Sequence, residues 1–185
     1  MKYFTPELFR AANSSDMDLA LDASDQWEAA AKSYRRRLKS IKKKLPAGLN
    51  LFLDTIDLHD AEICGLNLQV SDAEVLGLNV QKATLFAKIR EGIVVLSYQL
   101  DSTPVIEYDQ LPASLVSLPR LWLYDEFDIL EGNLSPNRVT HEIFLSDGVL
   151  IQFRFTDFAF KMFPTALSDP RCSPAVDQRE RLVSV

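Results

Sequence analysis

Hydrophobic and polar positions divide this chain into a helical first third and a β-rich remainder. Between residues 16 and 44, apolar side chains recur at spacings of three, four and seven, the period of one helix face. From about residue 60 to 163, the apolar runs are short, β-branched or aromatic, and separated by turn residues. Helices followed by strands, without alternation, predict an α+β fold in which an N-terminal helical segment packs on a curled antiparallel β-sheet.

Three helices are predicted in the helical part, residues 1–56. The first, over residues 5–12, begins with TPE, which supplies an N-cap, a first-turn proline and an acid at the positive helix end. Ser15 with Asp18 resembles a capping box for the long second helix. A brief third helix is predicted in LNLFLDTI. The buried face of the long helix, over 16–44, is expected to hold Trp27, Ala31, Tyr34, Leu38, Ile41 and Leu45.

The β part, residues 57–163, completes a single domain, and the polar, Pro-rich stretch 164–185 is expected to be a loose C-terminal arm. A tight turn is predicted at 90–92, and a long connection at 101–120. The predicted strands are Ala61–Val70, Val75–Val80, Thr84–Arg90, Ile93–Leu100, Val105–Tyr108, Leu121–Leu130, Val139–Leu145 and Val149–Met162.

One hairpin can be predicted residue by residue, because its sequence THEIFL-SDG-VLIQFRF must segregate polar from apolar side chains. A two-residue loop would set Glu142 opposite Phe153, on a largely apolar face. A three-residue loop over 146–148, with Gly148 left-handed in a G1 bulge, sets Glu142 opposite Gln152 instead. The apolar face then consists of Val139, Ile143, Leu145, Val149, Ile151, Phe153 and Phe155, together with His141.

Two consecutive stretches, HDAEICGLNLQV at 59–70 and SDAEVLGLNVQK at 71–82, match at seven of twelve positions. Apolar side chains change parity within each copy at a glycine, Gly65 or Gly77, so a β-bulge is predicted at both. The repeat therefore indicates two similar bulged strands. Only His59 distinguishes the first copy, and any function there belongs to that histidine.

The amino-acid composition argues against several classes of protein. The 185 residues are 47% hydrophobic and 25% charged, as in an ordinary globular protein. No apolar run approaches the roughly 18 residues of a membrane span, and the opening lacks the apolar core of a signal peptide. We therefore expect a cytoplasmic protein without membrane contact. Cys64, expected in the core, and Cys172 lack zinc spacing, and the sequence has no nucleotide-binding or hydrolase motif, so no cofactor is expected.

Charge is unevenly distributed. The net charge is −6, yet the segment 32–44, KSYRRRLKSIKKK, holds eight of the 20 basic residues and no acid. The remaining 12 basic residues face 26 acidic ones, which leaves a body of charge −14. We expect this basic segment to meet the acidic body or an acidic protein partner. Nucleic acid ranks below both, because no aromatic stacking motif accompanies the segment. Its candidate binding residues are Arg35, Arg36, Lys42 and Lys43.

The two histidines each precede an acid, as His59-Asp60 and His141-Glu142. With Glu62 and Asp125 they could form a two-histidine, one-carboxylate metal site. The hairpin register instead places His141 on the apolar face, which favours a hydrogen-bonded structural histidine and no metal. We expect His59 and Asp125 to lie close together. The candidate catalytic residues are His59, Asp60, Asp125 and His141.

Asp125 is the acid whose environment matters most. On a regular strand it points with Leu123 and Phe127 toward the presumed core, whereas Glu126 lies on the opposite face with Trp122. A carboxylate that points into a core needs a partner or a raised pKa. A buried hydrogen-bonding role is favoured over general acid–base work.

Four motifs, MKYFTPELF at 1–9, LHDAEI at 58–63, WLYDEFD at 122–128 and HEIFLSDG at 141–148, occur in the order seen in one family. They resemble an uncharacterised bacterial family of unknown function whose members commonly open with MKYFT. That resemblance implies no activity. LHDAEI at the entry to a β region is also similar to immunity-type proteins of bacterial toxin systems.

Three functions follow from these observations. The first is a non-enzymatic binding or interaction protein, of which an immunity-type protein is one kind. The second is a small hydrolase or metal-dependent enzyme that uses His59, Asp125 and His141. The third is nucleic-acid binding through the basic helix segment 32–44. The sequence leaves the oligomeric state and the partner open.

Overall fold

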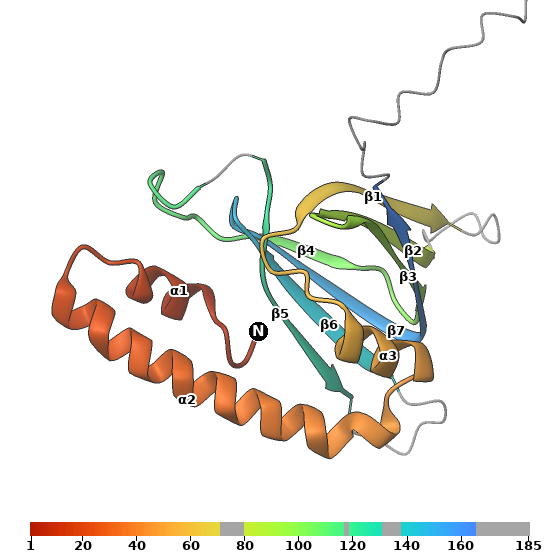
Figure 1. Cartoon of the computed structure of the whole chain (residues 1–185), viewed down its shortest axis with the longest axis horizontal. Coiled ribbons are helices and arrows are strands. Elements are labelled where there is room, and N and C mark those ends of the chain that lie inside the picture. Colours follow the sequence, from red (N-terminus) through yellow and green to blue (C-terminus); the bar gives the residue numbers. More distant parts are fainter. Residues whose placement is uncertain (71–79, 117–118, 131–137, 166–185) are drawn as a thin grey trace, which may run out of the picture.

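The computed structural model describes residues 1–70, 80–116, 119–130 and 138–165, and it confirms the α+β class: helices pack on an antiparallel sheet that curls into a half-barrel (Figure 1). The helices are α1 (Pro6–Ala12), α2 (Met17–Ile41) and α3 (Ala47–Thr55). The strands are β1 (Glu62–Val70), β2 (Val80–Ile89), β3 (Gly92–Leu100), β4 (Val105–Tyr108), β5 (Trp122–Ile129), β6 (Val139–Leu145) and β7 (Val149–Pro164). Within the described residues, no helix is both long and apolar enough to cross a bilayer.

The helix ends follow local capping chemistry, with two corrections. Thr5 caps α1 as predicted, and its hydroxyl accepts from the Leu8 N–H. The cap of α2 is Asp16 and not Ser15, because the Asp16 carboxylate reaches two free N–H groups of the first turn. The α-helical part of α2 ends at Ile41, and residues 42–44 form a 3₁₀ turn.

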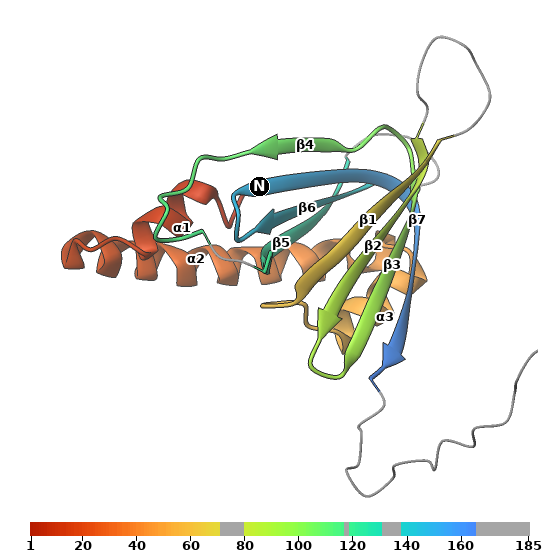
Figure 2. The ribbon, with the colours of Figure 1, turned by 90° about the horizontal axis from the view of Figure 1, so that it is seen from above.

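The sheet has the strand order β1-β2-β3-β7-β6-β5, and β4 pairs with β7. Strand β7 holds the two halves together, since its first part pairs with β6 and β4 and its last part pairs with β3 (Figure 2). Strands β1 and β5, which end the strand order, also meet at one end of the sheet. There Glu62 bridges Leu121, and the Trp122 N–H donates to the Ala61 carbonyl at 2.8 Å. The sheet is therefore curled far enough for its edges to touch.

The predicted hairpin between β6 and β7 is confirmed in register and in loop length. Gly148 has φ +85°, and its N–H donates to the Leu145 carbonyl across the three-residue loop. Glu142 pairs with Gln152, and His141 is fully buried. Segregation of polar from apolar side chains was thus sufficient to fix this register.

The predicted bulge at Gly65 is confirmed, because the β1–β2 register shifts between Ile63 and Gly65. Cys64 is the extra residue, and it is exposed, so its assignment to the core was wrong. The bulge turns the thiol away from the interior. The second predicted bulge at Gly77 and most of the strand Val75–Val80 lie outside the described residues.

The long connection 101–120 contains β4, as predicted, and the 90–92 turn joins β2 to β3. Strand β7 runs one position into the predicted arm, to Pro164, and the N–H of the next residue, Thr165, donates to the Glu91 carbonyl. The rest of the predicted arm lies outside the described residues.

Two apolar clusters cover the two faces of the sheet. The larger fills the concave face and joins it to α3 and to the C-terminal end of α2; Leu49, Phe127 and Phe153 are fully buried there. The smaller lies on the opposite face of β5 and β6, where Phe9 of α1 packs on Phe144. This half of the sheet is therefore covered on both faces, and β5 runs beside α2 (Figure 1).

Helix α3 approaches the sheet closely at a glycine. A Cβ atom on Gly48 would lie 2.5 Å from the carbonyl oxygen of Phe158 in β7. Atoms of that kind do not approach so closely, so a side chain would push the helix off the sheet. Gly65 offers a contrast, since a Cβ there would meet only a Phe86 ring carbon at 3.9 Å.

We therefore expect Gly48→Ala to destabilise the fold by about 1–3 kcal/mol, although alanine favours helix formation elsewhere. Urea unfolding followed by tryptophan fluorescence measures the change. Gly65→Ala is the matched control and is expected to change stability by only about 0.5 kcal/mol. Equal stability of Gly48→Ala and the wild type would contradict the close approach.

Candidate functional site

A cleft of about 440 Å³ lies between α2 and β5. Helix α2 contributes one wall, β5 the other, and the turn before β1 closes one side. We call it the α2–β5 cleft. Its lining consists of Phe4, Ala31, Tyr34, Arg35, Leu38, Asp57, His59, Trp122, Leu123, Tyr124 and Asp125.

A bulge in β5 decides which side chains enter this cleft together. The register with β6 shifts between Trp122 and Tyr124, which makes Leu123 the extra residue. Trp122 and Asp125 therefore belong to the same face, and Leu123 packs in the outer cluster with Tyr124. The prediction that Leu123 shares the core face with Asp125 was wrong, because regular alternation does not survive a bulge.

The Asp125 carboxylate is held at both oxygens. The indole Nε1–H of Trp122 donates to Oδ1 at 3.0 Å, and Nε2 of His141 lies 3.2 Å from Oδ2. The side chain of Asp125 is still 29% exposed. Each carboxylate oxygen can accept more than one hydrogen bond. Asp125 thus presents a fixed negative group with acceptor capacity left over at the cleft.

Behind Asp125, a chain of hydrogen bonds runs into the core. The Tyr98 hydroxyl lies 3.0 Å from Nδ1 of His141, and both side chains are fully buried. A neutral imidazole that donates from Nε2 to Asp125 accepts from the Tyr98 hydroxyl at Nδ1, so each bond has one proton. Burial lowers the pKa of His141, and the hydrogen bond and charge of Asp125 oppose that shift only in part. Burial and then Asp125 raise the pKa of Tyr98.

His59 occupies the turn before β1 and not a strand. Its Nδ1 lies 2.6 Å from the Leu123 carbonyl oxygen, which can only accept, so Nδ1 carries the proton. Nε2 is then an acceptor in the neutral ring, and the Asp60 carboxylate is 3.8 Å away from it. Asp60 has φ +64°, a left-handed conformation that aspartate tolerates. His59 is exposed, and its ring packs against Tyr124.

The candidate catalytic residues are thus divided between two environments. His59 and Asp125 line the same cleft, whereas His141 lies in the core and reaches the cleft only through Asp125. Among residues 1–70, 80–116, 119–130 and 138–165, no three His, Cys, Asp or Glu side chains are grouped as a metal site would require.

Aromatic rings form much of the cleft wall. Phe4 packs against Tyr34 and Tyr124 with centroids 5.6 and 5.8 Å apart, and Trp27 lies 4.4 Å from Tyr124. Burial and then the charge of Asp125 raise the pKa of Tyr34, and burial and then Asp60 raise that of Tyr124. Burial is the larger cause of both shifts, and the carboxylates Asp125 and Asp60 contribute the negative charge near these rings.

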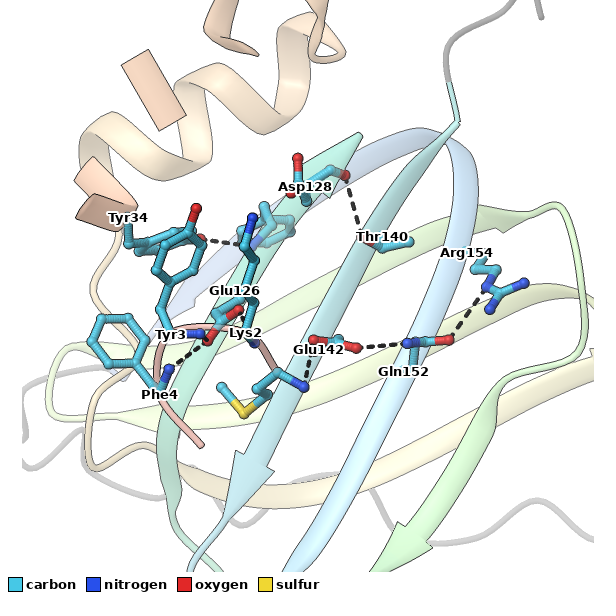
Figure 3. A network of polar contacts seen from close by, with 12 residues as sticks. Lys2, Tyr3, Phe4, Tyr34, Glu126, Asp128, Thr140, Glu142, Gln152 and Arg154 are labelled. Atoms are coloured by element: carbon cyan, nitrogen blue, oxygen red, sulfur yellow. Dashed lines mark hydrogen bonds and ion pairs between the residues drawn. The ribbon is translucent and has the colours of Figure 1, made fainter. Parts of the chain in front are cut away.

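Glu126 fixes the segment that carries Phe4. Its carboxylate accepts from the backbone N–H groups of Lys2, Tyr3 and Phe4 at 2.7, 2.7 and 2.6 Å (Figure 3). Only 5% of Glu126 is exposed. Hydrogen bonds to a buried carboxylate are short and strong. The acid on β5 thereby anchors residues 2–4 across the outer face of the sheet.

Two carboxylates lie side by side at this anchor. Glu126 pairs directly with Glu142 across β5 and β6, an arrangement that is unfavourable unless donors surround it. Glu142 meets the Met1 amino group at 2.8 Å and accepts from the Gln152 amide at 2.6 Å (Figure 3). Three backbone amides, an ammonium group and a side-chain amide thus compensate two carboxylates.

Sequence reasoning missed both Glu126 and Tyr98. Glu126 was expected on a face with Trp122, and its backbone partners lie more than a hundred residues away. No local signal set Glu126 apart from the two other acids of the same strand, Asp125 and Asp128. Tyr98 alternates regularly in β3, but its bond to His141 depends on the curl of the sheet, which brings β3 to face β6.

The contacts of the basic segment 32–44 with the acidic body include two ion pairs. Arg37 pairs with Asp128 of β5 at 2.7 Å, and Lys42 pairs with Asp54 of α3 at 2.7 Å. The apolar stripe faces inward as predicted, with Tyr34, Ile41 and Leu45 buried. All four predicted binding residues, Arg35, Arg36, Lys42 and Lys43, are exposed, and Arg35 also lines the α2–β5 cleft.

No family model matches this chain, and no curated protein matches it. Its membership of the MKYFT family therefore stays a prediction that rests on four short motifs. Function has to be inferred from the chemistry of the cleft and of the surface beside it.

The buried histidine gives a pH prediction. The pKa of His141 lies below its ordinary value of 6.5, so the unfolded chain binds a proton in a range where the folded chain does not. Stability should therefore fall as the pH drops below about 6.5, by at most about 1.4 kcal/mol per pH unit from this group. Urea unfolding at about pH 7.5 and about pH 5.5 measures it. His141→Gln should flatten this dependence, and His59→Gln should retain it; the reverse pattern would contradict a neutral core histidine.

The anchor gives a stability prediction. Glu126→Gln replaces the carboxylate that accepts from three backbone N–H groups by a neutral amide. The NH₂ group of the glutamine then faces one of these N–H donors, so we expect the free energy of unfolding to fall by about 3 kcal/mol. The free energy of unfolding in urea measures it. Glu28→Gln, on the exposed side of α2, carries the same change and should alter stability by only about 0.5 kcal/mol. A similar small effect for both variants would show that the anchor contributes nothing to stability.

Proposed function

We propose that this protein is a non-enzymatic binding protein whose α2–β5 cleft receives a positively charged side chain of a protein partner. The observation that carries the proposal is the Asp125 carboxylate, which Trp122 and His141 hold in place while it stays 29% exposed. Because these bonds are already made, no ordering of the carboxylate is needed when a cation binds.

Charge and shape both favour a cation. Asp125 lies at the cleft, and it and Asp60 add to the burial that raises the pKa values of Tyr34 and Tyr124. Arg35 is the cation in the lining. Asp57 adds a further exposed carboxylate at the lining. Aromatic faces attract cations through the negative charge of their π systems, and arginine is the commonest partner. A guanidinium group suits the cleft particularly well because it can donate to a carboxylate and stack on a ring.

The enzymatic alternative has less support from the geometry. His141 is enclosed by Tyr98, Phe127 and Asp125, so it cannot reach a ligand directly. His59 has the tautomer of a general base, with Nε2 as acceptor. General base catalysis also needs a positioned nucleophile or electrophile-stabilising group within hydrogen-bond reach of the reacting atom. The carboxylates of this cleft would repel the negative charge that develops in acyl or phosphoryl transfer.

The Trp122 indole N–H reports on the site directly, because it donates to Asp125. We expect N-acetyl-arginine amide to shift its signal in ¹⁵N heteronuclear NMR spectra, with a dissociation constant of about 1 mM for so small a ligand. N-acetyl-citrulline amide has the same shape without the charge and should produce a much smaller shift. Asp125→Asn should abolish the difference between the two ligands.

Asp157→Asn is the matched control, since it removes an exposed carboxylate from β7 and leaves the cleft intact. It should bind the arginine ligand as the wild type does. Equal shifts with arginine and citrulline, or none with either, would contradict a cation site.

A further inference from the structure

A second concavity lies beside the cleft, between the C-terminal half of α2 and α3. It has a volume of about 270 Å³, and we call it the α2–α3 groove. Leu38, Leu45 and Leu53 supply apolar side chains to it. It shares Leu38 and Arg35 with the α2–β5 cleft, so the two form one continuous surface along α2.

Positive charge surrounds the apolar lining of the groove. Arg35, Lys39 and Lys42 border it, and all three are exposed. Asp54 is the acid in the lining, and it pairs with Lys42 where 49% of the lysine and 58% of the aspartate side chain are exposed. Such a solvated pair contributes little and can exchange partners at low cost. The segment 32–44 contains no acid that would offset the remaining charges.

We propose that the α2–α3 groove docks an acidic amphipathic helix of a protein partner. Its apolar residues would lie on the leucines, and its Asp and Glu side chains would meet Arg35, Lys39 and Lys42. From Arg35 to Lys42 the groove follows two turns of α2, about 10 Å at 1.5 Å per residue. That length suits apolar anchors at positions i, i+3 or i+4, and i+7 of the partner helix, the usual pattern of helix-in-groove recognition.

The same basic charges could attract nucleic acid, but the leucine lining favours a protein. Single-stranded nucleic acid is bound by aromatic platforms on which bases stack. The aromatic rings of this surface lie in the neighbouring cleft, where Asp57 and Asp125 would repel phosphate. The apolar groove would stay empty beneath a bound phosphate backbone.

Docking in the groove is independent of the proposed cation site. Lys39, Lys42 and Leu53 line the groove and not the cleft, whereas Asp125 lines the cleft and not the groove. Variants can therefore remove either site alone. Lys39→Glu reverses a charge of the groove, and Lys82→Glu makes the same change on exposed β2, away from both concavities of α2.

The experiment selects random 16-residue peptides, displayed on phage, against the immobilised full chain, and measures the enriched peptides by fluorescence anisotropy. We expect peptides with net negative charge and leucine-like residues spaced by three or four. Lys39→Glu should weaken their binding about tenfold, and Lys82→Glu and Asp125→Asn should leave it unchanged. Higher salt should weaken binding without abolishing it, because the apolar contacts persist.

Three results would overturn the proposal: no enrichment, enrichment of neutral or basic peptides, and equal weakening by Lys39→Glu and Lys82→Glu. A 20-nucleotide single strand serves as the competing probe. If it binds the wild type at physiological salt and Lys39→Glu abolishes that binding, the basic groove recognises nucleic acid instead. Failure of the arginine ligand in the cleft would leave the groove prediction standing.

Discussion

The carboxylate of Glu126 is the group on which the helical part of this structure depends. It lies buried on a strand, opposite Glu142, and it is tolerable there because backbone N–H groups of residues 2–4 surround it. Those same bonds draw the N-terminal segment across the sheet and place Phe4 between Tyr34 and Tyr124. The outer face of β5 and β6 is thereby covered, and α2 gains the aromatic contacts that hold it beside β5. One buried charge thus connects the start of the chain with the last part of the sheet.

The bulge at Leu123 has a comparable effect on the cleft. It brings Trp122 onto the face of Asp125, so the indole can donate to the carboxylate three residues later. The same carboxylate accepts from His141, which is connected to Tyr98 on a strand that is not adjacent to β6. The partly exposed Asp125 is in this way hydrogen-bonded to the buried pair His141 and Tyr98, which lie on different strands of the half-barrel. A chain of hydrogen bonds of that kind rigidifies its members, which suits a binding site better than a catalytic group that must change protonation.

Charge is separated along α2. The carboxylates Asp57 and Asp125 lie beside aromatic rings in the cleft near its middle, Lys39 and Lys42 lie beside leucines in the groove near its end, and Arg35 lies between, in the lining of both. A partner that carries a basic side chain beside an acidic amphipathic helix would fit the cleft and the groove together in one orientation only. Electrostatic complementarity of this type selects partners and orients them more than it adds affinity. The two proposed sites would then act as one surface.

The sequence by itself determined the elements and one register. Helix caps, apolar periodicity and turn residues are local, so they predicted α1, most of the length of α2, the positions of β1 and of β3 to β7, and the three-residue loop before Val149. Strand β2 begins at Val80, four residues before its predicted start. Asp125 points toward the core with Phe127 as predicted, but its neighbours on that face were not all predicted, because a single bulge at Leu123 reverses alternation and leaves no glycine to mark it. Tertiary structure alone decided that Glu126 is buried, that His59 and Asp125 share a cleft while His141 does not, and that Cys64 is exposed. Each of these features depends on contacts between distant segments or on the curl of the sheet. Neither such contacts nor the curl have a local sequence signal.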